Sequence, residues 1–154
     1  MTLLAVLFAI GHALAGAAWF GSMVYSLTVL QPRAVRFFAT AGLFEEFIAV
    51  VSAGARWKVL AAFAFIAVTG LGLLLLRLPE PVSSLWWVLV AAKVGLFLAA
   101  LAVFWYVSWR LWPARVVALP AEVPALQRQF RRIGWTMLLL VGLNLVLGIV
   151  VHRI

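Results

Sequence analysis

Four long apolar stretches, separated by short polar segments, dominate the pattern of the sequence. They cover about residues 3–30, 57–78, 85–110 and 133–151. About 20 apolar residues suffice for a helix to cross the hydrocarbon core of a bilayer, and longer stretches cross it with some tilt. The pattern therefore predicts an all-α integral membrane protein. Its single domain, residues 1–154, is expected to be an antiparallel four-transmembrane-helix bundle with a short interfacial helix.

The polar segment after the first stretch predicts that interfacial helix. Gln31-Pro32-Arg33 is expected to end the first helix, because proline cannot continue the hydrogen-bond ladder without a break. Residues 33–56 then carry arginines and two glutamates, Glu45 and Glu46, among phenylalanines, a mixture too polar to span comfortably. The two glutamates are candidates for functional carboxylates, but we favour the interpretation that they balance the nearby arginines at the membrane surface.

Proline and serine mark the remaining boundaries. Pro79-Glu80-Pro81 predicts a short turn, after which Ser83 and Ser84 are expected to cap the third helix. Pro124 suits the first turn of a helix that leads into the fourth stretch. The sequence shows no convincing internal repeat.

Composition agrees with a membrane protein. Of the 154 residues, 68% are hydrophobic and 10% are charged, whereas soluble domains are about half apolar and a quarter charged. The net charge of +8 comes from basic residues beside the apolar stretches, so we expect contact with anionic membrane lipid and no binding of nucleic acid. The absence of cysteine excludes disulfides and thiolate metal sites.

Lysine and arginine lie mainly on one side of the predicted membrane. The side reached after the first and third helices carries nine of them: Arg33, Arg36, Arg56, Lys58, Arg110, Arg115, Arg128, Arg131 and Arg132. The other side carries Arg77 and Arg153, and Lys93 falls within the membrane. Because cytoplasmic loops are enriched in these residues, both termini are predicted to lie outside.

Each predicted helix places one hydrogen-bonding side chain at a similar depth. At about 1.5 Å per residue, His12 lies roughly 14 Å and Lys93 roughly 12 Å from the outer surface. Thr69 and Asn144 come to roughly 14 Å and 12 Å on the helices that return. Since a polar group in hydrocarbon needs a partner, these four residues are predicted to face the interior of the bundle.

Their roles stay open on this basis. Asn144 and Thr69 suit contacts between helices as well as a site, and His12 suits either a backbone hydrogen bond or a ligand. Lys93 is costly to insert, which favours a functional partner or a role as proton carrier.

Histidine and methionine are the candidate metal donors. His12 is the best of them, and His152 lies on the same side but nearer the surface. Met23 and Met137 lie toward the cytoplasmic side as thioethers that suit Cu(I), unless they serve packing alone. A haem is the other possibility, with His12 as axial ligand and Arg153, Arg77 or Lys93 near its propionates.

Other chemistries lack their motifs. The chain has no nucleotide-binding loop, no Ser/His/Asp set and no helical two-histidine zinc motif. Conventional hydrolase and kinase activities are therefore unsupported.

Several short motifs resemble the CopD/HemJ-type superfamily of small multi-span bacterial membrane proteins. They are the run His12-x6-Trp19-x5-Tyr25, the pairs Pro32-Arg33 and Thr69-Gly70, and Trp86/Trp87 ahead of Lys93. The CopD side of the superfamily is linked to copper uptake or resistance, and the HemJ side is a haem-associated protoporphyrinogen oxidase. The resemblance implies a bacterial cytoplasmic membrane protein in which His12 and Lys93 are the key site residues, with Trp19 beside them.

Three functions follow as hypotheses. The first is CopD-like handling or transport of copper, with His12 as ligand and Lys93 and Asn144 as a supporting layer or gate. The second is a HemJ-like enzyme that binds haem b, in which Lys93 holds an acidic porphyrin or passes protons. The third is a non-catalytic subunit of a homo-oligomer or a larger membrane complex. The choice between copper and haem stays undecided.

Overall fold

The protein is built from helices joined by short loops. The computed structural model describes residues 2–153, with the backbone alone for His152 and Arg153. The elements are α1 (Leu3–Tyr25), the π-helix η1 (Ser26–Leu30), α2 (Gln31–Phe37), α3 (Ala41–Ser52), α4 (Ala55–Arg77), α5 (Ser84–Tyr106), the π-helix η2 (Val107–Leu111), α6 (Trp112–Val116) and α7 (Val123–Arg153). Within residues 2–153 every regular element is therefore helical.

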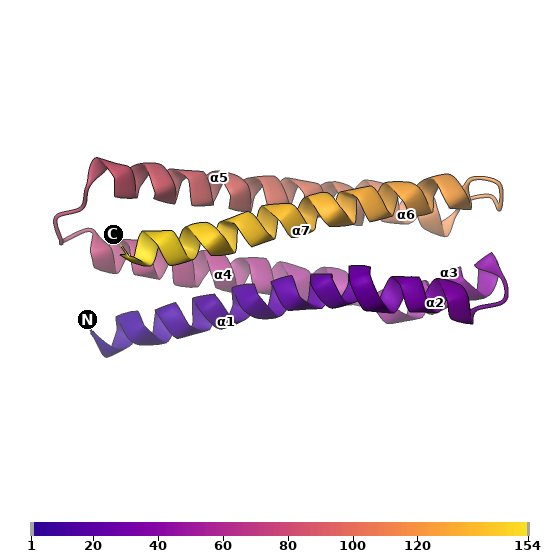
Figure 1. Cartoon of the computed structure of the whole chain (residues 1–154), viewed down its shortest axis with the longest axis horizontal. Coiled ribbons are helices and arrows are strands. Elements are labelled where there is room, and N and C mark those ends of the chain that lie inside the picture. The colour runs from indigo at the N-terminus through magenta and orange to yellow at the C-terminus, as the bar shows by residue number, and fades with distance from the viewer. Residues whose placement is uncertain (1, 154) are drawn as a thin grey trace.

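Four of the helical runs lie alongside one another (Figure 1). Leu3–Phe37, Ala55–Arg77, Ser84–Val116 and Val123–Val151 are each long and apolar enough to cross a membrane. Both ends of the chain and the α4–α5 turn lie at one end of the molecule (Figure 1). The other end holds α2, α3 and α6 and carries the nine lysines and arginines grouped above, so we name it the basic end.

Aromatic side chains form the centre of the bundle. The most buried cluster is contributed by α4, α5 and α7: Phe63, Ala100, Phe104, Met137 and Val141. Trp19 of α1 meets Phe63 edge to face, with ring centroids 4.5 Å apart. Such aromatic pairs add to the energy gained by burial, and they tie all four long helices to one core.

The first long helix does not end at Pro32, contrary to the sequence prediction. It continues through η1 and α2 to Phe37. Proline lacks an N–H group, and its ring collides with the carbonyl four residues earlier. The wider π-turn avoids this collision, and the Gln31 amide bonds to the Ser26 carbonyl five residues back. The α5–α6 run contains η2, which likewise ends two residues before its proline, Pro113.

The two π-turns occupy corresponding places in the two halves of the chain. Each half of the chain begins with a long helix that passes through a π-turn into a proline. His12 precedes Pro32 by the same interval at which Lys93 precedes Pro113. The side chains differ between the halves, so similarity in sequence does not show the relation.

Local capping fixes the ends of the helices. The Ser83 hydroxyl accepts a hydrogen bond from the Trp86 amide at 3.2 Å, which confirms Ser83 as a cap. Thr40 caps α3 in the same way at the Leu43 amide. Gly54 joins α3 to α4 with φ of 69°, a left-handed conformation that residues with a side chain rarely adopt. Position 54 therefore requires glycine, and its backbone conformation sets the angle between α3 and α4.

Candidate functional site

His12 and Thr69 meet between α1 and α4. The ring Nδ1 of His12 lies 3.0 Å from the Thr69 hydroxyl oxygen, and Thr69 is only 4% exposed. The Thr69 hydroxyl donates its own proton to the Phe65 carbonyl at 2.7 Å. With its proton directed at that carbonyl, the Thr69 oxygen is placed to accept from His12, which favours the tautomer that carries a proton on Nδ1. In a neutral imidazole this leaves Nε2 with a free lone pair, the form that binds a metal or accepts a proton.

Lys93 and Asn144 form a second pair, between α5 and α7. The Asn144 amide donates to the Lys93 backbone carbonyl at 2.8 Å, and the Lys93 ammonium donates to the Asn144 backbone carbonyl at 3.5 Å. The chain's four carboxylates, Glu45, Glu46, Glu80 and Glu122, all lie outside the four apolar stretches. In the described part of the chain, both ion pairs involve other groups, Arg77–Glu80 and Arg115–Glu45.

Glycines allow these side chains to lie against a neighbouring helix. A Cβ at Gly70 would come within 3.1 Å of the His12 ring, and one at Gly148 within 2.8 Å of the Lys93 ammonium nitrogen. Glycine at position 70 lets the rigid His12 ring lie close to α4, whereas Lys93 Nζ is the end of a flexible side chain that could shift away from a Cβ at position 148. The four polar residues predicted at a similar depth thus form two hydrogen-bonded pairs, which we name clasps: His12–Thr69 between α1 and α4, and Lys93–Asn144 between α5 and α7.

A cavity of about 680 Å³ opens near the basic end of the bundle. All nine elements contribute to its wall. Its apolar lining includes Trp19, Met23, Phe44, Phe104 and Met137, and its polar lining is Ser26, Gln31, Arg36, Arg115, Gln127, Arg128 and Arg131. The volume falls in the range of small-molecule sites. The wall therefore combines an aromatic and thioether surface with four guanidinium groups.

The arginines of this cavity are not equivalent. Arg36, Arg128 and Arg131 are exposed, and both ion pairs in the described residues involve other groups. The Arg115 side chain is only 9% exposed and is paired with Glu45. Three cationic groups at the cavity are therefore available to a ligand, and the fourth is engaged within the protein.

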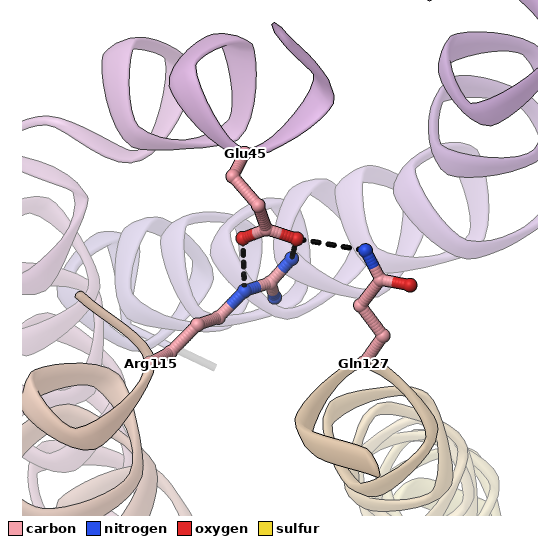
Figure 2. Close-up of polar contacts among 3 residues, drawn as sticks. All are labelled: Glu45, Arg115 and Gln127. Carbon is pink, nitrogen blue, oxygen red and sulfur yellow. Dashed lines mark hydrogen bonds and ion pairs between the residues drawn. The ribbon is translucent and has the colours of Figure 1, made fainter. Parts of the chain in front are cut away.

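Glu45, Arg115 and Gln127 join α3, α6 and α7 (Figure 2). Arg115 donates through Nε to one carboxylate oxygen at 2.7 Å and through a terminal nitrogen to the other at 2.9 Å. The Gln127 amide donates to the second oxygen at 2.8 Å. Two-pronged arginine–carboxylate contacts are among the stronger and more specific ion pairs. We name the contact of Glu45 with Arg115 and Gln127 the latch, and it holds α3 across the cavity.

The latch keeps Glu45 ionised. Burial by itself raises the pKa of Glu45, but the hydrogen bonds from Arg115 and Gln127 and the charge of Arg115 together hold it below its ordinary value of 4.5. The Arg115 guanidinium also lies over the Phe130 ring, 4.7 Å from its centroid. Glu45 is thus balanced by Arg115, far along the chain, and not by the adjacent arginines that the sequence analysis favoured.

The residues predicted for the site fall into two separate groups. His12, Thr69, Lys93 and Asn144 form the two clasps and, within the described residues, are not part of the cavity wall. Trp19, Met23 and Met137 line the cavity. The side chain of His152 lies outside the described residues. Among those described, no group of three or more histidine, aspartate or glutamate side chains gathers to hold a metal ion.

Sequence reasoning missed the cavity arginines as a group. The basic residues were assigned to topology, and only their spacing offered a signal. Arg128 and Arg131 are three residues apart at the start of α7, a spacing that brings side chains to one face of a helix. No protein-family model, curated protein or solved structure matches the chain. The likeness to the CopD/HemJ-type superfamily therefore rests on the short motifs alone.

Proposed function

We propose that the chain is an integral membrane protein whose four long helices form an antiparallel bundle. The support is physical: the four runs are long and apolar enough to span, and large apolar side chains such as Leu7, Leu14 and Leu139 point outward. Lipid accommodates such surfaces, whereas water does not. By the distribution of basic residues, the basic end faces the cytoplasm of a bacterial cell, with α3 at the interface and both termini outside.

We further propose that the cavity binds an amphipathic anion, a molecule with an apolar body and at least one acid group. The observation that carries this proposal is the composition of the wall. Trp19, Met23 and Met137 offer an apolar surface, and Arg36, Arg128 and Arg131 lie at the same cavity. Arginine is suited to carboxylate and phosphate because of its planar, forked set of donors.

A tetrapyrrole with propionate groups belongs to this class of ligand. The HemJ-like alternative therefore becomes a proposal about the cavity, in which the arginines hold the acid groups. His12 lies on the α1–α4 interface and serves this proposal only if its free Nε2 reaches the bound molecule. Among the three hypotheses, catalysis belongs to this HemJ-like alternative alone.

Copper handling is the second candidate. Met23 and Met137 both line the cavity, and Met23 packs against the core cluster that contains Met137. Thioethers suit Cu(I). Titration of Cu(I) into purified protein tests this candidate. Stoichiometric binding that is lost in Met23→Leu and Met137→Leu supports it, and binding unaffected by both substitutions counts against it.

The test of anion binding compares an acid with its ester. The protein is placed in nanodiscs of neutral phosphatidylcholine and titrated with a brominated palmitate, which quenches tryptophan fluorescence near its binding site. The methyl ester of the same compound has the same body without the charge. We expect saturable quenching by the acid, little quenching by the ester, and loss of part of the signal in Trp19→Phe.

Arginine variants localise the binding. Arg128→Gln and Arg131→Gln should each weaken binding of the acid about threefold or more, because each removes a charge-assisted contact. Arg110→Gln is the matched control, since Arg110 is exposed at the same end but does not line the cavity. Equal binding of acid and ester, or equal effects of all three variants, contradicts the proposal. Phosphatidylglycerol added to the nanodiscs shows whether membrane lipid competes for the same place.

A further inference from the structure

One acid-binding position of the cavity is occupied by the protein's own carboxylate. Arg115 and Gln127 both line the cavity, and together they direct three hydrogen bonds at Glu45. These donors are spaced for a planar group with two oxygens (Figure 2). Glu45 reaches them from α3, whose residues Phe44 and Ile48 also contribute to the wall.

We propose that the ligand of the cavity is a carboxylic acid, and that its carboxylate replaces Glu45 on Arg115 and Gln127. This inference rests on the proposed binding of an amphipathic anion and names the acid group. Glu45 is then an internal competitor of the ligand. Exchange of one carboxylate for another leaves every donor satisfied, so the partly buried Arg115 is not left without an anion, a state that is costly for a buried charge.

The exchange requires the Glu45 carboxylate to leave Arg115. Phe44 is 7% exposed and lies next to Glu45, so a displacement of α3 would also move a buried side chain at the cavity, whereas a rotation of the Glu45 side chain alone would not. α3 is bounded by Gly54, in its left-handed conformation, and by the short segment between α2 and α3. Withdrawal of the Glu45 side chain, by its own rotation or together with α3, leaves the packing of the long helices unchanged.

The binding assay with brominated palmitate tests the exchange. Glu45→Gln keeps the size of the side chain but removes the competing charge, and we expect this variant to bind the acid about tenfold more tightly than the wild type. Glu46→Gln is the matched control, because Glu46 is the exposed neighbour on the same helix, and its affinity should equal that of the wild type. Arg115→Lys keeps the charge but loses the fork, and should weaken binding of the acid.

The outcomes separate this inference from the proposed function. Binding of equal strength in the wild type and Glu45→Gln overturns the exchange and leaves anion binding intact. No binding in either protein overturns the proposed function itself. Hexadecylphosphonate is the probe for the acid group: a gain in Glu45→Gln as large as that of palmitate overturns the preference for a carboxylate. If Glu45→Gln fails to fold, Gln127→Met replaces it, with affinity for palmitate expected to fall about threefold and an unchanged affinity counting against the proposal.

Discussion

The Asn144 side-chain amide donates a hydrogen bond to the Lys93 backbone carbonyl, and the Lys93 ammonium donates a longer one to the Asn144 backbone carbonyl. The two contacts link α5 to α7 in the half of the bundle that carries the termini. Asn144→Leu should destabilise the protein by about 0.5–1.5 kcal/mol, the usual range for one interhelical hydrogen bond in a membrane protein. Thermal unfolding in detergent measures the change. Leu143→Ala, at an exposed neighbouring position, should have a smaller effect, and an equal effect would show that the clasp adds nothing.

Substitution of Lys93 by methionine should raise stability. Within the described residues the ammonium has a single carbonyl contact at 3.5 Å, and in the proposed membrane-spanning arrangement a charged group at this depth costs about 2.5–3.5 kcal/mol. Methionine keeps the length of the side chain and removes the charge. We expect a higher unfolding midpoint in lipid nanodiscs for Lys93→Met. A lower midpoint would mean that Lys93 is stabilised by an anion, and the prediction would be wrong.

The tautomer of His12 is a direct consequence of its contact with Thr69. Because the Thr69 hydroxyl proton goes to Phe65, neutral His12 should carry its proton on Nδ1. Nitrogen NMR of histidine-labelled protein distinguishes the two ring nitrogens, and the chain has only two histidines to assign. Thr69→Val removes this acceptor and should weaken the preference. A proton on Nε2 in the wild type would contradict the hydrogen-bond assignment.

The sequence was sufficient to predict where the helices lie, but not how two of them continue through a proline. The apolar stretches and the Ser83 cap depend on local patterns, which is why the four helices were located, although the first and third runs continue past their predicted ends to Phe37 and Val116. Pro32 misled the prediction, because its effect depends on whether the chain can widen into a π-turn. In η2 the Ser108 carbonyl accepts a hydrogen bond from the Arg56 side chain of α4, a contact between helices that local sequence patterns do not predict.

The candidate site, too, was predicted from the sequence only in part. Depth along a helix identified His12, Lys93, Thr69 and Asn144 as groups that need partners, and two clasps supply them. Depth alone does not say which helix lies beside which, so the pairing was not predicted. The cavity was missed altogether. Its latch joins Glu45 to Arg115, two residues that are distant in sequence and meet only after α3 has folded back on α6 and α7.

Acid should weaken the latch. The pKa of Glu45 is lower in the folded protein than its ordinary value of 4.5, so the folded state favours the ionised form. The resulting stabilisation is complete above the pKa of the unfolded chain and is lost as the pH falls through the lower, folded value. We expect the unfolding midpoint in detergent to fall as the pH is lowered from about 5. Glu45→Gln should flatten this dependence, whereas Glu46→Gln should not. Parallel curves for all three proteins would contradict the prediction.

The Arg56 side chain stabilises the second π-turn, η2, because it supplies a hydrogen-bond donor that Pro113 lacks. An ordinary residue at position 113 would offer its N–H to a carbonyl four or five residues earlier, and proline has none. The Ser108 carbonyl, five residues before Pro113, instead accepts a hydrogen bond from the Arg56 side chain of α4, which also lies 4.7 Å from the Trp109 ring centroid. Arg56→Ala should therefore cost about 1.5–3 kcal/mol, as expected for a hydrogen bond to a charged group. In a Pro113→Ala background, where the restored N–H supplies a donor, the cost should be clearly smaller. A double-mutant cycle from unfolding in detergent measures the difference, and strictly additive effects would show that Arg56 and Pro113 act independently.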